Sequence, residues 1–178
     1  IPRTMMMAVY GDMDISKITE KPKKRKKIIT LSKPESKIDE LYSFARTQIK
    51  NSNQIFWVCP LIEESKILNY SSVVKRYKII EKLFPNKVGL IHGALKKNDR
   101  KKILNDFLKK KIDILVSTTV IEVGIDFPNA NLIVIENSNK FGLAQLHQLR
   151  GRVGRGSGQG ICILLFKKNL SPNAINRI

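Results

Sequence analysis

Apolar positions along the chain follow two patterns, short continuous runs and longer stretches with helical spacing. The runs predict six buried strands, at 28–31, 54–59, 87–91, 112–116, 132–135 and 160–166. The stretches with apolar residues three or four positions apart predict helices after the first three strands and at 143–149. Near-continuous apolar strands alternating with amphipathic helices are typical of a parallel sheet with helices on both faces, so we expect an α/β fold.

Local signals predict where the helices begin and end. Ser32 is followed three residues later by Glu35, with Pro34 between, so Ser32 is expected to cap a helix that runs to about residue 50. Residues 60–71 read as a polar loop, and Pro85 should end the next helix. A very basic helix is expected at about 98–109, burying its four apolar residues, Ile103, Leu104, Phe107 and Leu108. Asp39 and Glu40 lie inside a predicted helix and are interpreted as surface residues.

The predicted topology brings several polar segments to one edge of the sheet. Ligands of parallel sheets bind at the carboxyl ends of the strands. This edge should hold the segments that follow four of the strands, which are Cys59-Pro60, His92-Gly93, Ser117-Thr118-Thr119 and the stretch around Asp126. These residues are functional candidates from topology alone.

The net charge of +18 indicates a polyanionic partner. Nucleic acid is the first choice and an anionic membrane surface the second, while a merely solvated lysine-rich surface stays open. Lys21–Lys27 reads as an exposed linker. No apolar run approaches the ~20 residues that cross a bilayer. Cys59 and Cys162 are far apart with no Cys-x-x-Cys pair, so we expect a reducing, cytoplasmic location and no structural metal site.

The stretch Ser117–Pro128 has residue types that suit a nucleotide or a phosphate. Small hydroxyl side chains at a strand end can donate to phosphate oxygens. Gly124 allows a close backbone approach, and Asp126 can accept from a ribose hydroxyl. The alternative is a strand-to-turn connection in which the threonines cap a helical turn.

The stretch Gln145–Gly156 ends in three arginines and three glycines within seven residues. A guanidinium has five donors in a planar fork and suits phosphate better than an ammonium does. Arg150, Arg152 and Arg155 cannot share one helix face, so some should face a ligand and others a neighbouring element. A flexible basic turn is the alternative. No glycine is followed by lysine, so a P-loop is absent and the chain cannot form a complete phosphoryl-transfer site by itself.

Asp126 followed by Arg152 and Arg155, on a parallel sheet without a P-loop, resembles the second RecA-like domain of superfamily-two helicases. Thr118–Asp126 looks like their motif five and Gln148–Arg155 like motif six. Three further segments are similar to the RecG family of bacterial branch-migration helicases, namely 10–12, 58–65 and 141–148. The transcription-repair coupling factor shares the last of them and is the alternative.

The resemblance implies a RecA-like three-layer fold and a division of the chain. Residues 1–27 would be the tail of a preceding helicase domain and a basic linker, because Ile1–Thr4 looks like the end of motif three. Residues 28–178 would be the second RecA-like domain, ending before the translocation hairpin. The preceding domain would supply the P-loop lysine and the acids that bind Mg²⁺, with ATP between the two domains. The chain alone is then expected not to hydrolyse ATP.

The resemblance also implies roles for individual residues. Arg155 would be the principal arginine finger on the γ-phosphate and Arg152 its partner. The remaining site residues would hold the ribose side of ATP (Gly124, Asp126), couple to the opposite domain (Gln148) or contact DNA phosphates (His92, Gly93, Thr118, Thr119). The implied partner is branched DNA, such as stalled forks and Holliday junctions, remodelled by a monomer during recombination and repair. The alternative of another class is a non-enzymatic nucleic-acid-binding module on a RecA-like scaffold.

Overall fold

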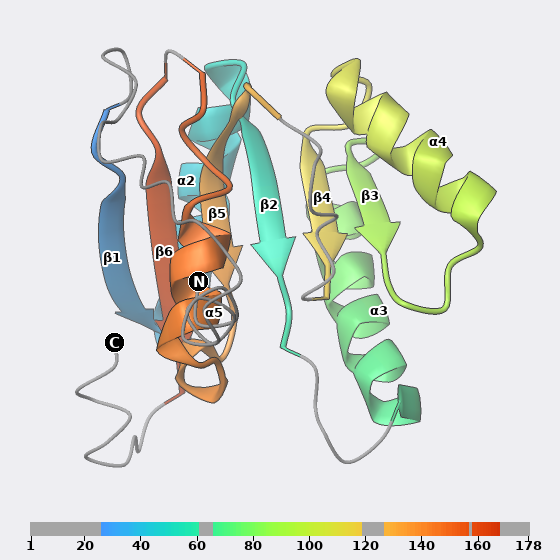
Figure 1. Ribbon diagram of the computed structural model, residues 1–178, viewed down its shortest axis with the longest axis horizontal. Coiled ribbons are helices and arrows are strands. Elements are labelled where there is room, and N and C mark those ends of the chain that lie inside the picture. Colours follow the sequence, from blue (N-terminus) through green and yellow to red (C-terminus); the bar gives the residue numbers. More distant parts are fainter. Residues whose placement is uncertain (1–25, 61–65, 119–126, 157, 168–178) are drawn as a thin grey trace, which may run out of the picture.

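The computed structural model describes residues 26–60, 66–118, 127–156 and 158–167. Within these ranges six strands form one sheet in the order β1-β6-β5-β2-β4-β3, and every neighbouring pair is parallel (Figure 1). The strands are β1 (Ile29–Pro34), β2 (Gln54–Val58), β3 (Val88–Ile91), β4 (Ile114–Ser117), β5 (Ala130–Ile135) and β6 (Ile161–Phe166). The predicted parallel α/β fold is confirmed.

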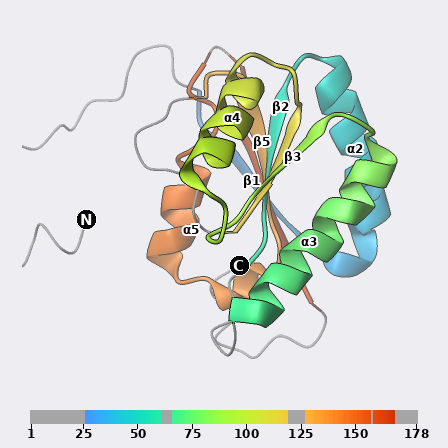
Figure 2. The same cartoon turned by 90° about the vertical axis from the view of Figure 1, so that its right-hand side faces the viewer.

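Four helices cover the two faces of the sheet, and two short 3₁₀ turns complete the described elements. The helices are α2 (Ile38–Lys50), α3 (Lys66–Leu83), α4 (Lys97–Leu108) and α5 (Leu143–Arg150), and the turns are η1 (Glu35–Lys37) and η2 (Ser138–Lys140). Figure 2 shows α4 and α5 on one face and α2 and α3 on the other. No helix in the described ranges is long and apolar enough to cross a membrane.

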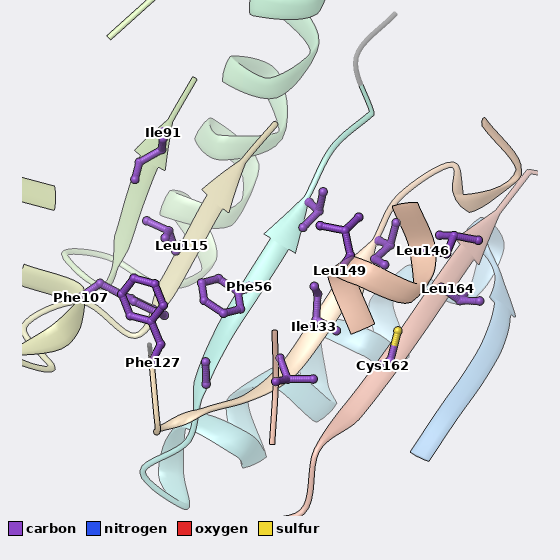
Figure 3. Packing of buried hydrophobic residues seen from close by; sticks show 14 of the residues in the cluster. Phe56, Ile91, Phe107, Leu115, Phe127, Ile133, Leu146, Leu149, Cys162 and Leu164 are labelled. Atoms are coloured by element: carbon purple, nitrogen blue, oxygen red, sulfur yellow. The ribbon is translucent and has the colours of Figure 1, made fainter. Parts of the chain in front are cut away.

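Alternate side chains of the central strands fill two cores, one on each face of the sheet. Phe56 of β2 and Ile133 of β5 point toward α4 and α5, whereas Trp57 and Val134 point toward α2 and α3. On the first face Phe56 packs against Phe107 of α4 and against Phe127, with ring centroids 5.4 Å away in both cases (Figure 3). These rings anchor α4 and the chain that enters β5.

Three expectations about the helices are wrong. Ser32 does not cap a helix, because it lies in β1 opposite Leu164 of β6, and no side chain caps α2. The loop predicted at 60–71 is too long, since α3 begins at Lys66. Leu108 was expected in the core but is 42% exposed, because Phe107 takes the inward position and α4 ends at Leu108.

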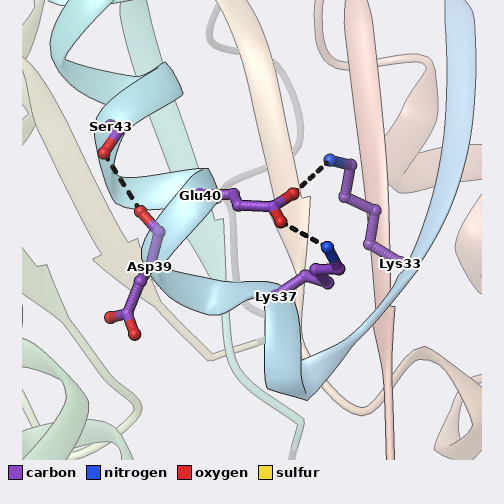
Figure 4. Close-up of polar contacts among 5 residues, drawn as sticks. All are labelled: Lys33, Lys37, Asp39, Glu40 and Ser43. Carbon is purple, nitrogen blue, oxygen red and sulfur yellow. Dashed lines mark hydrogen bonds and ion pairs between the residues drawn. The ribbon is translucent and has the colours of Figure 1, made fainter.

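Asp39 and Glu40 are exposed on α2, as the sequence indicates. Glu40 pairs with Lys37 one turn earlier and, at 3.3 Å, with Lys33 of β1, while the Ser43 hydroxyl donates to the Asp39 carbonyl (Figure 4). The hydrogen bond from Lys37 is the main reason that the pKa of Glu40 is lowered. Exposed ion pairs contribute little to stability, so this cluster mainly orients α2 against the end of β1.

Candidate functional site

The arginine-rich segment follows α5, which is fixed on the sheet by its own sequence. Gln145 accepts a hydrogen bond from the Gly142 amide at 3.0 Å and so satisfies a free donor at the start of the helix. Leu146 and Leu149 are both 7% exposed and pack into the core over β5 and β6 (Figure 3). The helix therefore delivers residues 151–156, hereafter the arginine loop, to a defined place on this face.

The three arginines have different surroundings. Arg150 contacts Nδ1 of His147 at 3.0 Å, so it supports α5 itself. Arg155 is exposed, and its Nε donates to the Gly151 carbonyl at 3.2 Å. The pKa of Arg152 is lowered, first by burial and then by the positive charge of Arg155, although an arginine stays protonated at neutral pH.

Arg152 and Arg155 therefore form a pair of neighbouring positive charges. Arg152 has no ion pair with a carboxylate in the described part of the chain. An anion placed between the two guanidinium groups would relieve their mutual repulsion and could accept several charge-assisted hydrogen bonds. A phosphate fits this requirement.

Two glycines let the arginine loop pass close to β5. Gly154 has φ +65°, and a Cβ on it would lie 2.9 Å from Cα of Gly160. A Cβ on Gly156 would lie 2.4 Å from the carbonyl oxygen of Pro128. The Gly154 amide also donates to the Ala130 carbonyl at 3.1 Å. The loop thus contacts the residues that directly follow the candidate Asp126.

We expect Gly154→Ala to reduce the free energy of unfolding by about 1–3 kcal/mol, because an L-residue is strained at this φ and its methyl group meets Gly160. Gly93→Ala is the matched control, since no atom of the described residues lies within 4 Å of its Cβ position. The control should change stability by no more than about 0.5 kcal/mol. Urea unfolding followed by circular dichroism measures both, and equal stabilities would contradict the geometry.

The carboxyl edge of the sheet brings together three of the predicted segments. The Cys59 amide donates to the Ser117 carbonyl at 2.8 Å, and the Thr118 amide donates to the Ile91 carbonyl at 3.3 Å. His92 directly follows β3, and Gly93 beside it is exposed with open space at its Cβ position. Burial, followed by the charge of Arg100, lowers the pKa of His92. At neutral pH the imidazole is therefore a neutral hydrogen-bonding group rather than a cation.

Thr118 is less accessible than the sequence suggests. It is 3% exposed, and its Oγ1 is buried without a hydrogen-bond partner among the described residues. A buried hydroxyl of this kind normally has a hydrogen-bond partner. The predicted contact of Thr118 with a DNA phosphate stays a prediction. Thr119, Gly124 and Asp126 lie outside the described residues, as does most of the basic run Lys21–Lys27.

The described candidates fall into two groups. His92, Gly93 and Thr118 lie at the carboxyl edge, whereas the arginine loop lies on the α5 face near the amino end of β5. Gln148 is exposed on α5 and belongs to the second group. Phe127, which follows Asp126, is buried beside Phe56 and is hydrogen-bonded to Ala130 at the start of β5. The segment after Asp126 thus meets the arginine loop rather than the carboxyl edge.

A buried ion pair near the carboxyl edge was not found from the sequence. Glu136, the residue after β5, pairs with Arg76 of α3 and accepts from Nε1 of Trp57 at 2.5 Å. Arg76 also donates to the Tyr42 hydroxyl at 2.8 Å. Burial raises the pKa of Glu136, although Arg76 and Trp57 oppose this. The available signal was a glutamate directly after the apolar run Leu132–Ile135, but nothing in the neighbouring sequence identifies Arg76 as its partner.

Both cysteines are buried and free. Burial raises the pKa of the Cys162 thiol to about 12, and burial together with the charge of Glu136 raises that of Cys59 well above its usual value. Neither thiol is a nucleophile at neutral pH, which leaves the arginine loop and the carboxyl edge as the candidate sites.

Comparison with known proteins relates both sites to one class of protein. Residues 33–157 match the helicase conserved C-terminal domain. The chain is 50% identical over 167 residues to the ATP-dependent DNA helicase RecG of Thermotoga maritima, covering 93% of the chain and 21% of that protein. It is 47% identical over 182 residues to RecG of Aquifex aeolicus, covering 100% of the chain and 23% of that protein. The chain thus spans about a fifth to a quarter of the length of these relatives.

A solved structure agrees in sequence and in fold. RecG bound to a three-way DNA junction superimposes with a TM-score of 0.82 at 44% identity, covering 99% of this chain and 23% of that one. The match extends over both candidate groups and over the RecA-like sheet that carries them.

Proposed function

Because the chain belongs to the family of helicase conserved C-terminal domains, we propose that it is the second RecA-like motor domain of an ATP-dependent DNA helicase. Residues 28–178 would form this domain and residues 1–27 the connection from a preceding one. The observation that carries the proposal is the pair Arg152 and Arg155 of the arginine loop, two positive charges that affect one another, in a sequence without a P-loop.

Such a pair is useful in a split ATP site. The preceding domain would provide the P-loop and the residues that bind Mg²⁺. Arg155 is exposed and would donate to the γ-phosphate across the cleft, and Arg152 would stabilise the same negative charge. Gly124 and Asp126 would hold the ribose, and the contact of Gly156 with Pro128 supports a place for Asp126 beside the arginine loop. Gln148 would contact the opposite domain.

The DNA would lie along the carboxyl edge. His92, Gly93, Thr118 and Thr119 would contact phosphates, which gives binding to the backbone rather than to a base sequence. The open space at Gly93 supports a close approach of the DNA backbone. Similarity to RecG supports branched DNA as the substrate and RecG rather than the transcription-repair coupling factor as the kind of motor. ATP-dependent closure against the preceding domain would then move the protein along an arm of the DNA.

The test compares this chain alone with the chain joined to a preceding P-loop domain, hereafter the joined protein. The chain alone is expected to show no ATP hydrolysis above background, because it has no P-loop. The joined protein should hydrolyse ATP and be stimulated by branched DNA, measured as phosphate release. Robust hydrolysis by the purified chain, or none by the joined protein with DNA, would contradict the proposal; the second result would favour a non-enzymatic DNA-binding module.

A further inference from the structure

The outer face of α4 and the turn after it form a strongly basic surface outside both candidate groups. Residues 97–111 contain seven lysines and arginines but only two aspartates. Leu104 and Phe107 bury the inner face of α4. Lys101, Lys102 and Lys109 are exposed and lie within about 100° of one another around the helix, opposite the buried face. Together with exposed Lys110 they are called the lysine surface.

The charges of the lysine surface are not neutralised within the protein. Lys111 pairs with Asp106 at 3.5 Å, and Lys87 pairs with Asp113 at 3.1 Å nearby. In contrast, none of the four lysines of the surface has an ion pair with a carboxylate in the ranges that the structure describes. Four uncompensated positive charges on one helix and its turn suit a polyanion.

The backbone at Lys110 is a second, independent observation. Lys110 has φ +57°, in the left-handed region, and the Lys110 and Lys111 amides donate to the carbonyls of Phe107 and Asp106 at 3.1 and 2.9 Å. This is the helix-ending motif in which glycine is strongly favoured at the left-handed position. The chain instead has a lysine there, which is strained and exposed. A lysine at a position better suited to glycine indicates a use for its charge.

The position of α4 connects this surface with the DNA-binding edge. The helix begins a few residues after His92-Gly93 at the carboxyl edge and ends above β4 at the opposite edge (Figure 1). From Lys101 to Lys109 the helix rises about 12 Å, which corresponds to about three to four base pairs of duplex. Phosphates of one duplex could therefore contact the whole surface.

We propose that the lysine surface binds the phosphate backbone of a duplex arm that extends away from the carboxyl edge. The proposal rests on the proposed function, since it assumes that the chain acts on DNA. It adds a contact that holds one arm of branched DNA on the outer side of the domain, away from the arginine loop. Binding there is independent of base sequence and sensitive to salt.

The test uses the 178-residue chain and a fluorescent DNA duplex in an anisotropy titration at several salt concentrations. Exchange of Lys101, Lys102, Lys109 and Lys110 for glutamine is expected to weaken binding at least about tenfold at 50 mM salt and to reduce the salt slope by about three to four units. The matched control exchanges four exposed lysines of α2 and α3, Lys50, Lys75, Lys78 and Lys82, on the other face of the sheet. The control variant has the same net charge as the surface variant, and it should keep most of the salt slope of the wild type.

Lys110→Gly separates DNA binding from folding. It relieves the left-handed strain, so the melting temperature should rise, yet the salt slope should fall by about one unit. Equal binding by wild type, the surface variant and the control would overturn the proposal for the lysine surface and leave the proposed function standing. Equal loss in the surface variant and the control would also overturn it, because only net charge would then matter. A wild-type chain that binds no duplex would also overturn the proposal for the lysine surface, whereas the proposed function is tested by ATP hydrolysis in the joined protein.

Discussion

Replacing Arg155 by alanine in the joined protein is expected to reduce DNA-stimulated ATP turnover by about 10³-fold or more, within the range known for arginine fingers. The loss follows from removing a cation that stabilises charge on the γ-phosphate in the transition state, and Arg152 alone cannot replace its geometry. Arg155→Lys should recover only part of the rate, because an ammonium lacks the planar fork of donors. Phosphate release under saturating ATP and branched DNA measures the effect.

Arg150→Ala is the matched control for Arg155→Ala. Arg150 lies two residues before Arg152 and five before Arg155 in the same segment, but it contacts His147 of its own helix. Its removal should leave turnover within a few-fold of wild type, and DNA binding should be similar in all three variants. If Arg155→Ala and Arg150→Ala had equal turnover, Arg155 would not be the finger.

The second large effect concerns the buried pair of Arg76 and Glu136. Their side chains are 15% and 9% exposed. Arg76→Met keeps most of the apolar stem but leaves Glu136 without its counter-charge. Breaking a buried pair in this way typically costs about 3–5 kcal/mol, and we expect a loss of that size in the free energy of unfolding at pH 7. Urea unfolding followed by circular dichroism is the measurement. Tryptophan fluorescence is less suitable, because Trp57 itself contacts Glu136.

The loss should depend on pH. Burial holds the pKa of Glu136 above its ordinary value in the folded state, and removing Arg76 takes away an interaction that lowers it. Folding therefore favours the protonated carboxyl, and stability falls as the pH rises from the unfolded pKa of 4.5 through the raised folded pKa. The variant should thus lose much less stability at pH 4 than at pH 7.

Glu136→Gln added to Arg76→Met is the control for the unpaired charge. The double variant should recover most of the loss and should show little dependence on pH in this range, because no ionisable group is left at either position. A single variant with the same loss at pH 4 and pH 7, or a double variant no more stable than the single one, would contradict the assignment. The pair joins α3 to the chain that leads from β5 into α5.

The sequence predicts those parts of the fold that local pattern determines. Buried strands such as Gln54–Val58 contain a continuous apolar run, here Ile55–Val58, so their positions follow within one or two residues. The parallel topology then places His92 and Thr118 at one edge. The Ser32 cap was wrong because pairing with Leu164, far away in sequence, overrides a local helix signal.

Contacts between segments that are distant in the sequence cannot be predicted from the local sequence pattern. Glu136 and Arg76 are sixty residues apart, and only the fold brings them together. The approach of Gly156 to Pro128 is likewise a tertiary contact. The roles of Arg152 and Arg155 came from resemblance, and the structure adds that their charges are close enough to affect one another.

The most direct test of the split ATP site is a crystal structure of the joined protein with a non-hydrolysable ATP analogue and Mg²⁺. Our account predicts that the guanidinium of Arg155 lies about 2.8 Å from an oxygen of the γ-phosphate, with Arg152 on the same phosphate group. The P-loop of the preceding domain should hold the opposite side. A γ-phosphate surrounded by residues of the preceding domain alone, with Arg152 and Arg155 directed away from a closed cleft, would contradict it.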